Sequence, residues 1–359
     1  MTFIYCSTDL GINSSGGLVS YYELEALQQL GEETNNDVIS FDFKDLHPTQ
    51  YKLPDLPLLI DYIMMGKLLK MDLSNVKMAH FYGGCYSNTI QYLKSKGIKT
   101  IFTLMWHDRK VSIMEHEKFF GRYPYEYVRD DIIFDMFTEG IRHADVVIAA
   151  GSAPRNNMLN EGARRVEIIP LGCDIPDEDK IIKLPLQEFK VGYLGQIGAD
   201  KGLYYLIKTW ESLNYLDSTL LFAGTNPEYL NQFINVFAKA GKYHIMGYVN
   251  NVADFYNSIG IYVQPSATEG FGMTVIQAMS YGRSVICSDG AGAADCITDG
   301  EDGFIVPAMN IDAIVDKIQY FKNNPGEIIR MGNNARVNSL NYTWKLAQDK
   351  YIRLWRSLL

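Results

Sequence analysis

Short runs of apolar residues alternate with longer amphipathic stretches along the whole chain. The runs occupy 2–6, 37–43, 76–82, 99–105, 145–150 and 165–170 in the first half, and 189–195, 218–224, 243–247, 259–266 and 284–289 in the second half. Their length and near-continuous apolar character predict strands, and the stretches between them predict helices. This alternation is typical of parallel sheets that helices cover on both faces, so we expect an α/β fold.

Three of the amphipathic stretches predict helices with identifiable limits. Residues 18–31 have helical periodicity and end at Gly31, a residue suited to a C-cap. Residues 55–71 form the most apolar long segment, but charged residues and a glycine interrupt it, which predicts an amphipathic helix and not a membrane span. At the end of the chain, residues 344–359 place their apolar side chains on one stripe, which predicts a packed helix.

The length of the chain and one irregular segment predict two domains. A chain of 359 residues is too long for one ordinary core. Segment 173–188 combines prolines, a charge run and no clear periodicity, as linkers do. We therefore expect a first domain at 1–172 and a second at 187–340, each with a Rossmann-like sheet. Ligands bind at the carboxyl ends of the strands in such sheets, so candidate residues are expected just after strands.

Composition narrows the class of protein. A net charge of −9, with 47% hydrophobic residues, is typical of a soluble globular chain. Both halves carry more acidic than basic residues, which argues against a nucleic-acid partner and predicts at most weak membrane association. The five cysteines form no C-x-x-C pair, which argues against a disulfide framework or a zinc site. The start, MTFIYCSTDL, does not resemble a signal peptide, so we expect a cytoplasmic protein.

The stretch TEGFGMTVIQAMSYG, residues 268–282, follows a predicted strand and opens a predicted helix. Unpaired N–H groups and the positive end of the dipole make the start of a helix suitable for a phosphate. Gly270 and Gly272 let the backbone approach a ligand closely, whereas Glu269 would repel an anion and suits a sugar hydroxyl. The alternative is an acidic residue that only stabilises the start of the helix.

A second strand–glycine–helix stretch, LGQIGADKGLYYL, covers residues 194–206. Lys201 falls in the predicted first turn of the helix, where a cation is electrostatically unfavourable. An anionic ligand bound at the same turn would compensate for this position. A solvated lysine is the alternative.

Two further candidates follow strands of the first half. Gly16 and Gly17 lie between the first strand and the first helix, in a predicted loop that could approach a ligand. The surrounding sequence matches neither G-x-G-x-x-G nor the P-loop, so neither of these phosphate sites is predicted. His107 and Asp108 directly follow the strand at 99–105, where ligand groups concentrate, although a structural histidine is the alternative.

Together these stretches resemble the retaining glycosyltransferases of family 4, which have the GT-B fold. The family pattern is a glutamate, Gly-Phe-Gly, a second glutamate eight residues after the first, and Ala-Met-Ala-x-Gly. Here the pattern reads Glu269, Gly270, Phe271, Gly272, Gln277 and AMSYG. HADVVIAAGS, IIPLGCD and the early glycine pair are also similar to the family, so the resemblance covers nearly the whole chain. It implies two Rossmann-like domains that face across a cleft, with a C-terminal helix at 341–359 crossing back to the first domain.

The resemblance implies a role for each candidate. Glu269 would hold hydroxyls of the donor sugar, and the amides of Phe271 and Gly272 would bind sugar and phosphate. His107 would lie near the transferred sugar. The glycine pair at 16–17 would close over the diphosphate of the donor.

Two positions depart from the family pattern. Gln277 stands where the second glutamate usually holds the nucleotide ribose. Gln196 stands where an arginine usually acts with the counterpart of Lys201 on the diphosphate. Of these two cationic positions only Lys201 is charged here, so the strength of donor binding depends on it.

The resemblance also implies the partners of the reaction. The donor would be a UDP- or GDP-sugar, used as a co-substrate with no further cofactor, and the acceptor would be a glycan or another hydroxyl compound. Residues 177–179, DED, have the spacing of a metal-binding D-x-D motif. They fall in the predicted linker, so we interpret them as a solvated charge run and expect no essential metal.

Other function classes remain open at this point. A nucleotide-sugar epimerase with the same fold would release nucleotide and sugar without an acceptor, and a two-lobed sugar-binding protein would not catalyse a reaction. A nicotinamide-dependent oxidoreductase is disfavoured because G-x-G-x-x-G is absent. The aromatic stretch 112–137 either packs in a core or stacks on acceptor sugars. Its candidate aromatic residues are Phe119, Phe120, Tyr123, Tyr125 and Tyr127.

Overall fold

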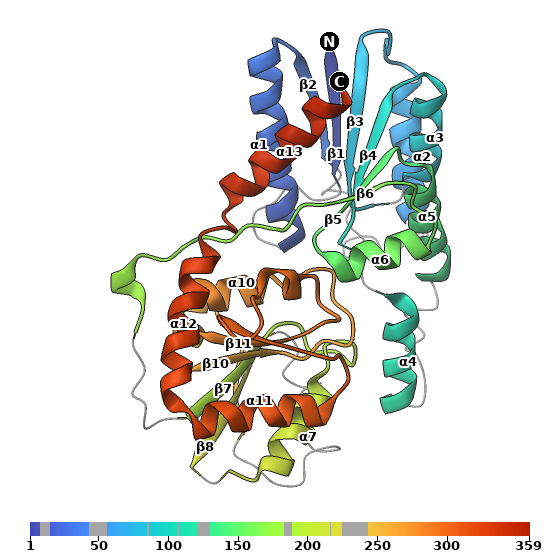
Figure 1. The fold of residues 1–359 in the computed structure, drawn as a ribbon. Helices are drawn as coiled ribbons and strands as arrows, with labels where there is room; N and C mark the ends of the chain where they lie inside the picture. The colour runs from blue at the N-terminus through green and yellow to red at the C-terminus, as the bar shows by residue number, and fades with distance from the viewer. Residues whose placement is uncertain are drawn as a thin grey trace. The chain divides into compact units, whose positions relative to one another are not determined.

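The computed structural model describes residues 1–7, 15–42, 56–84, 86–105, 108–120, 130–182, 189–215, 217–224 and 243–359. The chain forms two compact units. The first comprises 1–106, 123–171 and 344–359, and the second comprises 107–122 and 172–343. Figure 1 shows that each unit has a sheet with helices packed against it. By its contacts, the helix at 109–120 belongs to the second unit, although it lies in the first half of the sequence.

The first unit is built on a six-stranded parallel sheet. The strand order is β2-β1-β3-β4-β5-β6, so the order reverses between β1 and β3. The strands are β1 (Thr2–Ser7), β2 (Asp37–Asp42), β3 (Val76–Tyr82), β4 (Lys99–Thr103), β5 (Val146–Ala149) and β6 (Val166–Ile168). The helices are α1 (Ser15–Thr34), α2 (Leu56–Leu68), α3 (Ser87–Ser95), α5 (Asp130–His143), α6 (Ser152–Asn160) and α13 (Trp344–Leu358).

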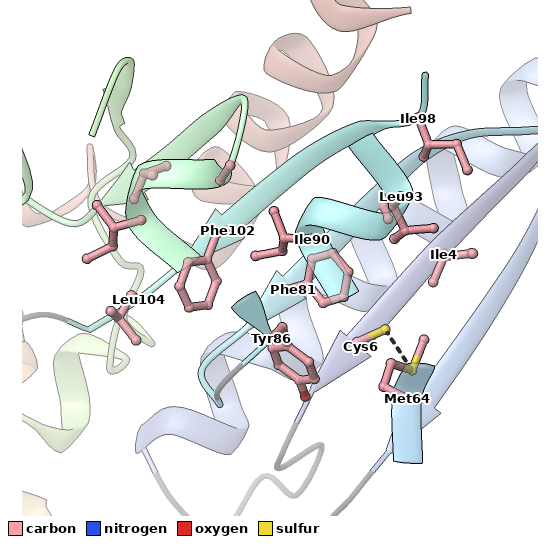
Figure 2. Packing of buried hydrophobic residues seen from close by; sticks show 14 of the residues in the cluster. Ile4, Cys6, Met64, Phe81, Tyr86, Ile90, Leu93, Ile98, Phe102 and Leu104 are labelled. Atoms are coloured by element: carbon pink, nitrogen blue, oxygen red, sulfur yellow. Dashed lines mark hydrogen bonds between the residues drawn. The ribbon is translucent and has the colours of Figure 1, made fainter. Parts of the chain in front are cut away.

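The core of the first unit lies between the central strands and the helices α2, α3 and α5. Ile4, Phe81 and Phe102 come from β1, β3 and β4, and all three are fully buried. Figure 2 shows Ile90 and Leu93 of α3 packed over these strands. Burial of large apolar side chains of this kind stabilises a fold by about 1.5–3 kcal/mol each.

The C-terminal helix α13 packs on the other face of this sheet, over a buried polar cluster. Trp355 lies edge-on to the His80 ring, with centroids 5.4 Å apart. Glu23 of α1 is fully buried and accepts a hydrogen bond from the Tyr5 hydroxyl at 2.7 Å. Burial raises the pKa of Glu23 to about 7, although hydrogen bonds from tyrosine hydroxyls act to lower it. These contacts make the end of the chain an integral part of the first unit.

The second unit has a second six-stranded parallel sheet, in the order β12-β11-β10-β7-β8-β9. Its strands are β7 (Phe189–Leu194), β8 (Ser218–Ala223), β9 (Tyr243–Gly247), β10 (Ile261–Gln264), β11 (Ser284–Ser288) and β12 (Gly303–Val306). Its helices are α4 (Arg109–Phe120), α7 (Leu203–Leu213), α9 (Val252–Tyr256), α10 (Met273–Ser280), α11 (Ile311–Asn323) and α12 (Pro325–Ser339), together with the short 3₁₀ helices η3 (Glu178–Lys180) and η4 (Gly292–Cys296). This is the strand order of a doubly wound Rossmann sheet, with β7 and β10 side by side at its centre.

The predicted α/β fold with parallel sheets is confirmed, and every strand range predicted from the sequence contains a strand. Two local predictions were incomplete or wrong. Strand β12 was missed because its apolar run, GFIV, is very short. Gly31 is not a C-cap, because α1 continues to Thr34. A Cβ at Gly31 would lie 2.9 Å from the carbonyl oxygen of Asn36, so this glycine permits the close return of the chain into β2.

Within the part of the chain that the structure describes, no helix combines the length and the apolar character needed to cross a bilayer. Helix α2 lies within the most apolar long segment of the sequence and ends at Leu68. Asp61, on this helix, is buried. The Asp61 carboxylate accepts hydrogen bonds from the backbone N–H groups of Asn88 and Thr89 at 2.9 Å. The Asp61 side chain therefore caps the start of α3.

Candidate functional site

The loops after β7 and β10 meet at the point where the strand order of the second sheet reverses. The backbone N–H of Ala267, after β10, donates to the carbonyl of Asp200, after β7, at 2.8 Å. Neighbouring strands whose connections run to opposite sides leave a crevice at their carboxyl ends, where ligands bind in sheets of this type. The two glycine-rich stretches singled out from the sequence are therefore brought to one place.

Lys201 and Glu269 form an ion pair in this place. Their Nζ and Oε2 atoms are 2.9 Å apart, and the side chains are 15% and 23% exposed. The Oδ2 atom of Asp200 is 3.4 Å from the same Nζ. Burial by itself lowers the pKa of Lys201, but the two carboxylates outweigh it and hold that pKa above its usual value. Lys201 is therefore charged, with two anionic neighbours and little access to water.

The predicted position of Lys201 in a helix was wrong. Helix α7 begins at Leu203, and Lys201 lies in the turn before it. The positive end of the α7 dipole disfavours a cation at Lys201, and the carboxylates of Asp200 and Glu269 compensate for this within the protein. A bound anion is consequently not needed to explain why a lysine occupies this position.

Gly202 makes this arrangement of the turn possible. It has a φ of 73°, in the left-handed region that favours glycine. A Cβ atom here would lie 1.9 Å from the carbonyl oxygen of Pro265. The turn carrying Lys201 can thus approach the loop after β10 only because residue 202 has no side chain.

The EGFG stretch is held by backbone pairing with the segment after β11. The N–H of Glu269 donates to the carbonyl of Gly290 at 3.0 Å, and the N–H of Ala293 donates to that of Phe271 at 2.8 Å. The Phe271 ring is buried in the unit, so only its main chain is available to a ligand. Gly272 is the N-cap of α10, with a φ of 94°, and Gly270 is buried beside it. The backbone of this stretch is therefore fixed at the start of α10.

Gln277 lies on α10 and is half-buried. The Tyr256 hydroxyl lies 3.1 Å from its Oε1 atom and 3.1 Å from the carbonyl oxygen of Thr274. The carbonyl of the Gln277 side chain is thus already in contact with a donor. Its amide group can still donate a hydrogen bond to a ligand.

Gln196 lies in the loop after β7, with an exposed side chain. Its backbone carbonyl accepts a hydrogen bond from the buried Tyr193 hydroxyl at 2.7 Å. This contact fixes the backbone of the loop while the side chain stays at the surface. An arginine could occupy the position without losing the contact, because only the main chain makes it.

The remaining sequence candidates are Gly16, Gly17, His107 and Asp108. Gly16 and Gly17 lie in the first turn of α1, in the first unit, so the prediction of a loop there was wrong. His107 lies outside the described residues. Asp108, which follows it, belongs to the second unit, and its backbone N–H donates to the Thr268 hydroxyl at 2.7 Å.

Two further sequence interpretations concern charge and aromatic residues outside the glycine stretches. Asp177 is exposed and pairs with Lys180 at 2.8 Å, so the DED run is a solvated charge run as predicted. Phe119 packs on the Tyr204 ring with centroids 4.3 Å apart, which supports core packing for this residue. The side chains of Phe120, Tyr123, Tyr125 and Tyr127 lie outside the described part of the chain.

Sequence reasoning missed several residues that shape the site. They are Asp200, Gly202, Tyr256 and Thr268. Asp200 directly precedes Lys201 and Thr268 directly precedes Glu269, so adjacency to the motif residues was a signal that could have found both. Gly202 and Tyr256 act through contacts with distant segments, which no local pattern reveals.

Comparison with known proteins agrees with this geometry. A protein-family model described as glycosyl transferases group 1 matches residues 174–338. The matched stretch contains the β7 and β10 loops, and with them Lys201, Glu269 and Gln277.

Curated relatives match part of the chain. The capsular polysaccharide biosynthesis glycosyltransferase CapM of Staphylococcus aureus is 31% identical over 171 residues, which is 44% of this chain and 43% of CapM. An uncharacterized glycosyltransferase of Haemophilus influenzae is 30% identical over 175 residues, 46% of this chain and 47% of that protein. The matched part thus spans less than half the length of either relative, and it is similar in length to the stretch that the family model matches.

The fold is shared over the whole chain. Sucrose-phosphate synthase from Thermosynechococcus elongatus superimposes with a TM-score of 0.75 and 17% identity, covering 100% of this chain and 99% of that one. Anabaena HepE, in a complex with UDP and glucose, superimposes with a TM-score of 0.68 and 14% identity, covering 99% and 100%. The chain therefore has the GT-B fold of two Rossmann-like units, as the resemblance implied.

Proposed function

We propose that the protein is a retaining glycosyltransferase of family 4, which moves a sugar from a UDP- or GDP-sugar to a hydroxyl of a glycan. The observation that carries this proposal is the pair of Lys201 and Glu269, 2.9 Å apart within the stretch that the family model matches. A cation and a carboxylate side by side match two neighbouring parts of a nucleotide-diphosphate sugar, the diphosphate and the sugar hydroxyls. The names of CapM and of the outer core galactosyltransferase WaaB support a glycan as the acceptor.

The proposed mechanism uses the charge of Lys201 and the backbone at the start of α10. Lys201 would leave Glu269 and bind the diphosphate, whose negative charge grows as the bond to the anomeric carbon breaks. The amides of Phe271 and Gly272 would bind the sugar and phosphate at the same helix start. The acceptor oxygen would form the new bond on the face from which the diphosphate departs, and its proton would leave with the diphosphate.

Glu269 has a complementary role in the proposal. Once Lys201 turns to the diphosphate, the Glu269 carboxylate is free to accept hydrogen bonds from sugar hydroxyls. Its backbone pairing to the segment after β11 keeps it in place during this exchange. The ion pair thus represents the state of the site before donor binding, with each charge compensated by the other.

The test of the proposed function is product analysis. The chain would be incubated with a panel of UDP- and GDP-sugars, with and without glycan acceptors, and the products identified by mass spectrometry and by the anomeric configuration of the new bond. Transfer with retention supports the proposal. Free nucleotide and sugar without acceptor dependence would indicate an epimerase, and binding without turnover would indicate a sugar-binding protein.

We expect transfer to proceed without a divalent metal ion. Among the described residues, no group of three or more His, Cys, Asp or Glu side chains could hold a metal. Lys201 and the backbone at the start of α10 would stabilise the departing diphosphate in its place. Turnover measured in EDTA is expected to equal turnover without it. Loss of activity in EDTA with recovery on adding manganese would contradict this expectation.

The two departures from the family pattern are expected to compensate each other. A glutamate at 277 would keep the contact with Tyr256 and offer a second, charged acceptor to the ribose. Hydrogen bonds to charged groups contribute about 1.5–3 kcal/mol, against about 0.5–1.5 for neutral ones. The added negative charge would also repel the diphosphate, unless an arginine at 196 balanced it.

Gln277→Glu alone should therefore weaken donor affinity or leave it nearly unchanged, whereas Gln277→Glu with Gln196→Arg should improve it. Calorimetric titration of UDP across the two single variants, the double variant and the wild type measures this coupling. If the two changes are additive within error, Gln277 is simply a weaker ribose ligand.

A further inference from the structure

Helix α4 contacts both of the loops that form the candidate donor site. At its start, the backbone N–H of Asp108 donates to the Thr268 hydroxyl at 2.7 Å. Thr268 is 3% exposed and directly precedes Glu269. Farther along α4, Glu115 accepts a hydrogen bond from the Tyr205 hydroxyl at 2.8 Å, and Tyr205 lies in the first turn of α7, just after the turn that carries Lys201.

Helix α4 is held against α7 by a cluster of polar and aromatic contacts. Glu115 is fully buried, and Lys118 donates to the Tyr205 hydroxyl at 2.8 Å while lying 3.7 Å from Glu115. The Phe119 ring packs on Tyr204 beside them. A buried carboxylate is tolerated only where partners compensate it, so this cluster requires α4 to stay against α7.

Thr268 joins three segments through different atoms. Its hydroxyl accepts from Asp108 at the start of α4, and its backbone N–H lies 3.4 Å from the carbonyl of Asp200 in the Lys201 turn. The Asp108 carboxylate in turn accepts from the N–H of Val111 at 3.2 Å, which caps α4. One hydroxyl thus connects the start of α4 to the stretch that carries Glu269.

We propose that Thr268 is a positioning residue of the glycosyl transfer, which holds the start of α4 at the donor site through the backbone of Asp108. This rests on the proposed function. Its consequence is that α4, encoded in the first half of the chain, is part of the donor-binding unit. Because Thr268 directly precedes Glu269, the same hydrogen bond also holds the loop that carries Glu269 against the start of α4.

Thr268→Val tests the proposal, because valine keeps the branched shape and removes the acceptor oxygen. Hydrogen–deuterium exchange at the amides of 108–112 should be faster than in the wild type. The kcat for sugar transfer should fall by about 10- to 100-fold, as misplaced groups near the reacting atoms cost this much, while the Kd for UDP changes less than threefold. Thr268→Ser keeps the hydroxyl oxygen, so the exchange rate at 108–112 and the kcat of this variant should both match the wild-type values.

Tyr205→Phe provides a second variant, should Thr268→Val fail to fold. It removes the hydroxyl that bridges Glu115 and Lys118 at the far anchor, and it too should speed exchange in α4 and lower kcat. If Thr268→Val has the same exchange at 108–112 and the same kcat as the wild type, the positioning role of Thr268 is overturned. This result would leave the proposed function standing. If the wild-type chain binds neither UDP nor GDP, the proposed function is overturned, and the catalytic role of Thr268 with it.

Discussion

Replacing Lys201 with alanine is expected to lower kcat/KM for sugar transfer by about 10²- to 10³-fold. Loss of one preorganised group that stabilises developing charge typically costs about 2.7–4 kcal/mol in the transition state. The loss should lie at the upper end here, because Asp200 and Glu269 remain in the turn and would repel the diphosphate without an intervening cation. Steady-state kinetics with the donor identified by product analysis measures the effect.

Lys322→Ala is the matched control. The Lys322 side chain is 23% exposed and pairs with Asp217 at 2.8 Å, so Lys322, like Lys201, is a partly buried lysine in an ion pair. It lies beside Ser218 and Phe189, the first residues of β8 and β7. These are the amino ends of the strands, whereas the candidate site lies at the carboxyl ends. The kcat/KM of the Lys322→Ala variant should stay within about twofold of the wild-type value. The same result for Lys201→Ala would mean that another cation stabilises the diphosphate.

The sequence predicted the sheets well because their strands are buried on both faces. Runs such as 261–264 and 284–288 are short and largely apolar, and both became interior strands of the second sheet. Periodicity also identified α13, whose apolar stripe packs on the first unit. Patterns of this kind depend only on burial along one element, which is why local sequence contains them.

Properties that depend on contacts between distant segments could not be predicted in the same way. The amphipathic pattern around α4 predicts packing, but the partner of Glu115 is 90 residues away in α7. Likewise, the ion pair of Lys201 joins residues 68 positions apart, so the sequence alone left two explanations of this lysine open, a bound anion and simple solvation. The two stretches that meet after β7 and β10 could thus be singled out from the sequence, whereas the contacts that join them could not.

Replacing Gly202 with alanine is expected both to destabilise the second unit and to weaken UDP binding by more than tenfold. An alanine Cβ would lie 1.9 Å from the carbonyl oxygen of Pro265, a separation that no side chain can adopt. The turn or the loop after β10 must therefore move. Because Lys201 is adjacent to Gly202 and Glu269 follows Pro265 in the opposing loop, either movement separates the two groups that would bind the donor.

Gly300→Ala separates the effect of this contact from that of backbone conformation. Gly300 has a φ of 78°, close to the 73° of Gly202, but no atom lies within 4 Å of its Cβ position. The left-handed conformation alone costs a non-glycine residue about 1–3 kcal/mol, so Gly300→Ala should lower the midpoint of thermal unfolding and leave UDP affinity unchanged. Gly202→Ala should lower the midpoint further, because overpacking adds about 1–3 kcal/mol. Equal midpoints and equal UDP affinities for the two variants would show that the loop after β10 relaxes without cost and that its contact with Gly202 does not set the position of Lys201.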